Sequence, residues 1–254
     1  MIRTTLAAKA LAALLLLWSA PALAWTPATR IRMADEAVRL MPPSLRLALE
    51  HHREALLRGL LEPMTAEDSA EHKSRADGGS LDAEIASRMT ALEGAVASGK
   101  SFREIAKRLG ALAHFVADAT FPPAAEPEGA ARYSHFASFC ESRLPRFPLV
   151  FYGHDDENLQ RGDDRGFARG LIARAQEEDA QLAPAYVAVG TPSEPAAFDD
   201  RSVPFAVGSL EYSWTVTAIV RAWLTGWVRA GGDLRGTPYL DSASVYRRSK
   251  EATR

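Results

Sequence analysis

Apolar residues recur at helical spacing along most of the chain. In ATRIRMADEAVRLM, residues 28–41, apolar side chains at Ile31, Ala34, Val38 and Met41 fall on one face of a helix. Similar patterns predict further helices over 44–60, 81–97, 101–119, 134–143, 165–182 and 204–230. No stretch alternates apolar and polar residues as a strand does, so the predicted fold class is all-α, with a single helical domain.

The last predicted helix is the most apolar one and contains Trp214, Trp223 and Trp227. Glu211 and Arg221 interrupt its apolar run. Two charged residues in its middle disfavour a membrane span, and the pattern predicts a buried core helix.

The N-terminus has the layout of a secretory signal peptide. Basic residues precede a short apolar run over 10–18, and Ala22-Leu23-Ala24 forms a small-residue cleavage site. We expect cleavage between Ala24 and Trp25, and a secreted or periplasmic protein. An uncleaved membrane anchor is the alternative reading of residues 1–24. The remainder divides into a helical domain over 25–240 and a polar tail over 241–254.

Composition narrows the function classes. The hydrophobic fraction of 47% is enough for one large core. The single cysteine, Cys140, allows no internal disulfide, so stability must come from packing or from a bound metal. The formal charge is −2, and removing residues 1–24 takes away two basic and no acidic residues. This acidity disfavours electrostatic binding of nucleic acid.

Candidate chemistry centres on His114 and Asp118 in LGALAHFVADATF. Residues four apart share a helix face, so the imidazole and the carboxylate are presented together. This donor pair suits zinc, although the HxxxD spacing alone is more often a hydrogen-bonded pair. Gly110, one turn earlier, is expected to leave room beside the pair.

The order of these features resembles the bacterial zinc-dependent phospholipases C and the P1-type single-strand nucleases. The resemblance runs from Trp25 to about Glu141, through LMP in the first helix, RGLLEP, a later histidine and the HxxxD pair. It implies the all-helical fold of that family and a cluster of zinc ions. It also implies that a mature N-terminal tryptophan binds zinc through its amino nitrogen and carbonyl oxygen.

The resemblance assigns metal-ligand roles to five residues. Trp25 matches the N-terminal chelator, and His72 matches the histidine that follows the acidic segment. His114 and Asp118 match the central pair, in which the aspartate bridges two ions. His135 matches the histidine of the later pair.

Four departures reduce this ligand set. Where the family has histidine ligands, this chain has Arg30 and Ala124. Met64 stands where the family has an aspartate ligand, and Phe139 where it has a glutamate. A nearby carboxylate could replace the one lost at Met64, from Glu62, Glu67 or Asp68. We expect fewer than three Zn²⁺ ions, with the best site at His72, His114 and Asp118. Arg30 cannot bind a metal because its guanidinium stays protonated.

The resemblance implies metal-assisted hydrolysis of a phosphodiester, with Asp118 and Arg30 as the catalytic residues. Arg30 is expected to lie beside Asp118 in place of an ion, or to bind a phosphate oxygen. The mild acidity favours a phospholipid substrate and transient contact with a membrane surface over nucleic acid. The alternative is a non-catalytic relative that keeps the fold and acts as a binding protein.

Overall fold

A computed structural model describes residues 24–66, 69–122, 127–190 and 194–240. Within these ranges every regular element is a helix, which confirms the predicted all-α class. The expected signal peptide and the polar tail lie outside the described residues, apart from Ala24. None of the described helices is long and apolar enough to cross a membrane.

The α-helices account for most of the described residues. They are α2 (Pro27–Arg39), α3 (Pro43–His51), α4 (Arg53–Leu61), α5 (Leu81–Ala97), α6 (Phe102–Ala119), α7 (Pro127–Arg143), α8 (Glu157–Gln160), α9 (Asp164–Val189) and α10 (Val203–Arg229). Short 3-10 helices join them: η1 (Glu62–Ala66), η2 (Ala70–His72), η3 (Leu144–Arg146) and η4 (Pro195–Ala197).

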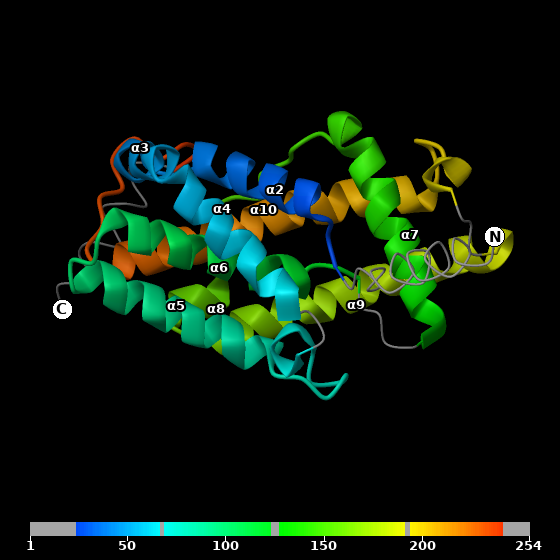
Figure 1. Ribbon diagram of the computed structural model, residues 1–254, viewed down its shortest axis with the longest axis horizontal. Helices are drawn as coiled ribbons and strands as arrows, with labels where there is room; N and C mark the ends of the chain where they lie inside the picture. The colour runs from blue at the N-terminus through cyan, green and yellow to red at the C-terminus, as the bar shows by residue number, and fades with distance from the viewer. Residues whose placement is uncertain (1–23, 67–68, 123–126, 191–193, 241–254) are drawn as a thin grey trace, which may run out of the picture.

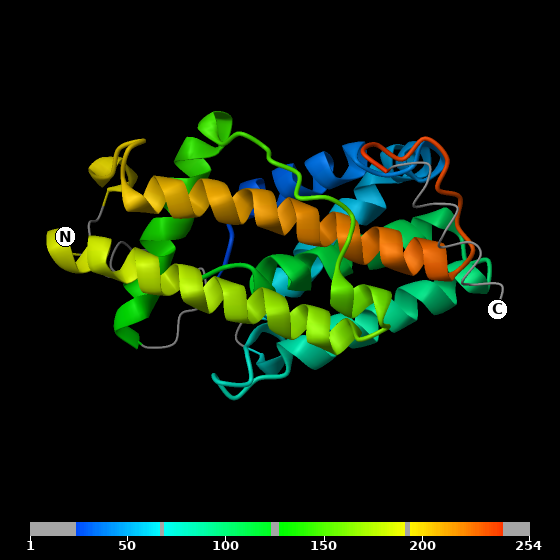
Figure 2. The same ribbon diagram turned by 180° about the vertical axis from the view of Figure 1, so that it is seen from behind.

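The long helices lie along the length of the molecule, and α7 crosses α9 and α10 steeply near one end (Figures 1 and 2). Helix α6 lies inside this bundle and packs against α4, α5, α9 and α10. Its sequence explains this position, because 11 of its 18 residues are buried and most of these lie between Leu109 and Ala119, whereas the charged residues of its first half form a polar face. The C-terminal half of α6 therefore directs its side chains into the interior of the protein.

Helix α10 is a core helix, as its sequence predicted. Trp223 is fully buried and donates its indole N–H to the carbonyl of Leu109 on α6, at 2.9 Å. The charged residues that interrupt the apolar run pair with polar groups: Glu211 with Arg174 on α9, and Arg221 with backbone carbonyls at Tyr152 and Gly153. These pairings allow the two charged residues to lie within a buried helix.

Two glycines allow α4 and α6 to approach closely. A Cβ added at Gly110 would lie 2.0 Å from the carbonyl oxygen of Leu56, and one at Gly59 would lie 1.9 Å from that of Lys107. The expectation that Gly110 leaves room beside the metal ligands is therefore wrong. The backbone of α4 fills that space.

Three predicted helix boundaries need correction. The helix expected over 44–60 is divided at His52, whose backbone angles (φ −105°, ψ 28°) leave the helical region. Helix α7 begins at Pro127 rather than near residue 134, with proline at a position where helices accept it. Helix α9 continues through Pro184 to Val189 instead of ending near residue 182.

Candidate metal centre

Helix α6 positions two of the candidate ligands. Ser101 caps its N-terminus by accepting a hydrogen bond from the Glu104 N–H, and the helix then continues without interruption to Ala119. His114 and Asp118 lie one turn apart near its C-terminal end, where their side chains meet. The HxxxD spacing therefore produces the local geometry that was predicted.

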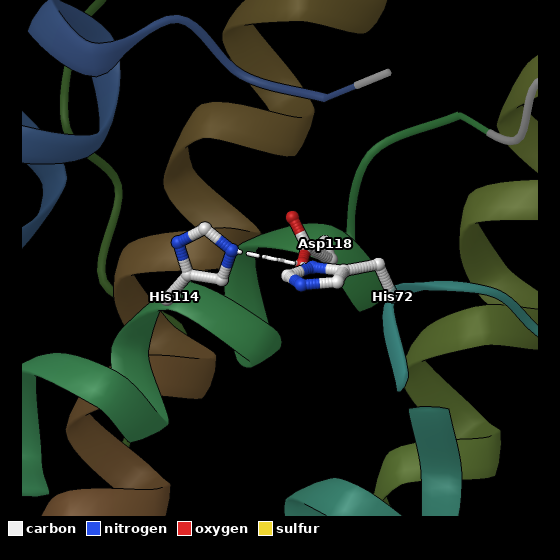
Figure 3. A group of neighbouring side chains, drawn as sticks. All are labelled: His72, His114 and Asp118. Carbon is white, nitrogen blue, oxygen red and sulfur yellow. Dashed lines mark hydrogen bonds and ion pairs between the residues drawn. The ribbon is translucent and has the colours of Figure 1, made fainter. Parts of the chain in front are cut away.

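His72 approaches this pair from a different part of the chain. It ends η2, between α4 and α5, and its ring stacks on Phe115 at a centroid distance of 4.7 Å. Figure 3 shows His72 and His114 pointing toward Asp118 from opposite sides. The structure thus brings together three of the five predicted metal ligands.

The three donor atoms converge. Nδ1 of His72 lies 2.7 Å from Oδ2 of Asp118 and 3.3 Å from Nε2 of His114. Nε2 of His114 lies 3.3 Å from the same carboxylate oxygen. Among the residues that the structure describes, these three form the group of His, Cys and acidic side chains able to hold a metal ion.

Hydrogen bonding prepares His114 as a ligand. Its Nδ1 lies 2.8 Å from the carbonyl of Leu60, which only accepts, so Nδ1 carries the proton. Burial lowers the pKa of His114, and the positive charge of Arg30 lowers it further. The ring is therefore neutral near pH 7, and Nε2 directs a lone pair toward His72 and Asp118.

Asp118 is held in its charged form. Burial alone would raise its pKa, but the guanidinium of Arg30, with the hydrogen bond to His72, outweighs burial and holds the pKa well below its usual range. Arg30 donates from Nη2 to Oδ1 of Asp118 at 2.5 Å. Oδ2 is thereby left to face the two histidines.

Arg30 is fully buried and each of its three nitrogens has an acceptor within the protein. Besides Asp118, Nε donates to the carbonyl of Trp25 at 2.8 Å, and Nη1 donates to the carbonyl of His114 at 3.0 Å. This places Arg30 beside Asp118, as expected. Three of its five N–H groups bond within the protein and the side chain is fully buried, so the observed role is to fix Asp118 rather than to present a phosphate-binding group.

The donor set fits one divalent metal ion. Ligand atoms around tetrahedral zinc, at bonds of about 2.0–2.2 Å, lie roughly 3.3–3.5 Å apart. Two of the three observed separations are 3.3 Å. The third, 2.7 Å between His72 and Asp118, is a hydrogen bond that would have to lengthen. The distances support a metal site but do not identify the metal.

His135 lies apart from this group. Its Nδ1 bonds the hydroxyl of Tyr186 and its Nε2 lies 2.8 Å from the carbonyl of Glu194, so both ring nitrogens have protein partners. Phe139, on the same helix, is buried against Phe198. The structure does not bring His135 together with the other predicted ligands.

Trp25 is buried and packs edge-on against Phe121, while its carbonyl accepts from Arg30. Ala124 lies outside the described residues, as do two of the three carboxylates proposed to replace the ligand lost at Met64. The third, Glu62, forms an ion pair with Lys107 at 2.7 Å and is half exposed. No additional carboxylate joins the cluster among the described residues.

Sequence reasoning missed the partners that orient the ligands. The carbonyl of Leu60 fixes the His114 tautomer, and Phe115 supports the His72 ring. Arg88 covers Phe115 at 4.1 Å from the ring centroid. A backbone carbonyl carries no residue-type signal, and Phe115 next to His114 looks like any core aromatic residue.

Comparison with known proteins does not assign a family. No family model matches the sequence, and no curated protein matches it.

Proposed function

We propose that this protein is an exported, zinc-dependent phosphodiesterase of the phospholipase C type that works with a single metal ion. The observation that carries the proposal is the convergence of His72 Nδ1, His114 Nε2 and Asp118 Oδ2 on one point. Three protein ligands leave a fourth position for water, which is the arrangement of hydrolytic rather than structural zinc sites.

Each residue of the site has a part in this proposal. His72, His114 and Asp118 would hold the ion, and the ion would lower the pKa of a water molecule and offset negative charge on the phosphodiester. Leu60 holds His114 in the tautomer that offers Nε2. Arg30 keeps Asp118 ionised and occupies its second oxygen, so the carboxylate offers a single atom.

A phospholipid is the proposed substrate class, hydrolysed during transient contact with a membrane surface. The acidic charge of the chain opposes the approach of polyanionic nucleic acid, whereas a vesicle of zwitterionic lipid carries no net charge.

A second candidate function is a non-catalytic, metal-binding relative of such enzymes. The observation that favours it is burial: the side chains of His72 and Asp118 are 6% and 4% exposed, and that of His114 is fully buried. Arg30, which could have bound phosphate, is used within the protein. Hydrolysis distinguishes the two candidates.

The test is phosphodiester hydrolysis by protein exported from a bacterial host, with bis(p-nitrophenyl) phosphate, phosphatidylcholine vesicles and single-stranded DNA as substrates. We expect zinc-dependent cleavage of the first two. Asp118→Asn should lower activity at least about a hundredfold, because it removes a charged metal ligand. His51→Ala, a change at an exposed histidine, is the matched control and should leave activity unchanged.

Zinc binding without hydrolysis of any of the three substrates would support the non-catalytic candidate. Cleavage of DNA alone would assign the nuclease branch. Hydrolysis that persists in Asp118→Asn would contradict the proposed site.

A further inference from the structure

The segment Ser69–Ser80, which carries His72, packs against the rest of the protein with little apolar contact. No described residue between Leu60 and Leu81 belongs to the buried hydrophobic core. Within the segment only Ser74 is buried as a whole residue, and its hydroxyl bonds Asp77 in the same segment. The segment therefore gains little stabilisation from apolar burial.

The backbone hydrogen bonds of the segment are local. The Ser80 N–H donates to the carbonyl of Ala70 at 2.7 Å, and the Leu81 N–H donates to that of Lys73 at 3.0 Å. A Cβ at Gly79 would lie 2.1 Å from the Lys73 carbonyl, so glycine is needed for the loop to close on itself. These contacts make the segment a compact loop joined to the first turn of α5.

Its polar contacts with α6 are made by His72 alone among the described residues. His72 bonds Asp118 and approaches His114, and its ring stacks on Phe115, which is also on α6. The other ion pair of the segment, between Arg75 and Asp82, leads back to α5. His72 is thus both a candidate metal ligand and the side chain that attaches the loop to α6.

We propose that the 69–80 segment is a metal-dependent latch: the ion bound by His72, His114 and Asp118 fastens this loop to α6, and loss of the ion releases it. The inference rests on the proposed metal site. The hydrogen bond to Asp118, the contact with His114 and the ring stack on Phe115 join loop and helix in the structure. Three ligand bonds to one ion would replace that hydrogen bond. The ion would enter and leave when the loop moves away from α6.

Hydrogen–deuterium exchange of the full protein tests the latch, with zinc content measured on the same samples. Adding zinc after chelation should slow exchange of the amides in Ser69–Ser80 by at least about tenfold. Exchange in the middle of α10 should stay unchanged. Glu71→Ala, at an exposed neighbour of His72, should keep the full effect. His72→Ala should lose it.

The outcomes separate the two proposals. Bound zinc with unchanged exchange in Ser69–Ser80 would overturn the latch and leave the metal site intact. Absence of bound zinc in the wild-type protein would overturn both. An equal effect in His72→Ala would show that zinc acts elsewhere and would also overturn the latch.

Discussion

Arg30 is the residue on which the site most depends. It neutralises Asp118 in the interior and satisfies two backbone carbonyls, those of Trp25 and His114. Replacing it with methionine removes the charge and keeps much of the side-chain volume. We expect Arg30→Met to lower the free energy of unfolding by about 3–5 kcal/mol, because a buried charge and two carbonyls lose their partner.

Urea denaturation measures this effect, and Arg39→Met on the same helix is its control. The Arg39 side chain is 70% exposed, so its loss should change the free energy of unfolding by no more than about 0.5 kcal/mol. A small effect of Arg30→Met would show that Asp118 and the two carbonyls do not depend on the guanidinium.

Glu211 should make stability depend on pH. Burial raises its pKa from 4.5 to about 7, against the opposing effect of Arg174, and its Oε2 has no hydrogen-bond partner among the described residues. The folded protein binds this proton more tightly than the unfolded chain. The resulting stabilisation is complete below about pH 4.5 and is lost as pH rises through 7.

Glu211→Gln should therefore flatten the decline in stability between pH 5 and 8, by up to about 3 kcal/mol. Gln keeps an oxygen that can accept from Arg174. Thermal unfolding of Glu211→Gln and the wild type across this pH range measures the difference. Glu177→Gln, on the surface of α9, is the control. A decline in Glu211→Gln as steep as in the wild type would rule out Glu211 as its source.

The sequence predicted some residues of the site but not all of their contacts. His114 and Asp118 follow from helical periodicity, since positions four apart must meet. His72 is 42 residues from His114, and the resemblance, not any local spacing, placed it in the site. Arg30 was expected beside Asp118 because of its charge. Its two carbonyl partners depend on tertiary packing, which cannot be read from a single sequence.

At the level of elements, the contact between α4 and α6 depends on two glycines. Gly110→Ala would drive a methyl group against the Leu56 carbonyl, so the helices must separate. We expect a loss of about 1–3 kcal/mol in the free energy of unfolding. Gly94→Ala, on α5, is the matched control, because nothing lies within 4 Å of its added Cβ. That change should stabilise the protein by up to about 1 kcal/mol.

Denaturation of the two alanine variants checks this prediction. Equal stability of Gly110→Ala and Gly94→Ala would contradict the close packing of α4 against α6.

Helices were predictable where apolar spacing was regular and their ends carried signals. The helix over 81–97 has the bounds predicted, and the helix predicted over 101–119 begins one residue later, because Ser101 is its cap. The break at His52 was missed because no proline or glycine marks it. The helix predicted over 165–182 instead continues through Pro184, at an exposed position where a lost backbone hydrogen bond costs less.

At the scale of the whole molecule, the hydrophobic core surrounds the charged centre formed by Arg30 and Asp118. Arg30 and His72 each bond one oxygen of Asp118, so groups of the protein itself compensate the buried carboxylate. We therefore expect the protein to fold without metal and to gain stability on binding it. Zinc at a hundredfold excess over its Kd should add about 2.7 kcal/mol to the free energy of unfolding.

Thermal unfolding with and without zinc checks this gain, and Asp118→Asn should lose most of it. His51→Ala should retain it. Unfolding of the wild-type protein on chelation would show instead that the ion is structural.

Zinc per chain, measured by elemental analysis on protein exported and processed by its host, tests the central claim most directly. We predict about one zinc ion in the wild-type protein, about one in His51→Ala, and a large loss in His72→Ala and Asp118→Asn. Two or more ions would mean that other residues complete a larger cluster. Absence of zinc from the correctly folded wild-type protein would contradict the metal centre and the function proposed from it.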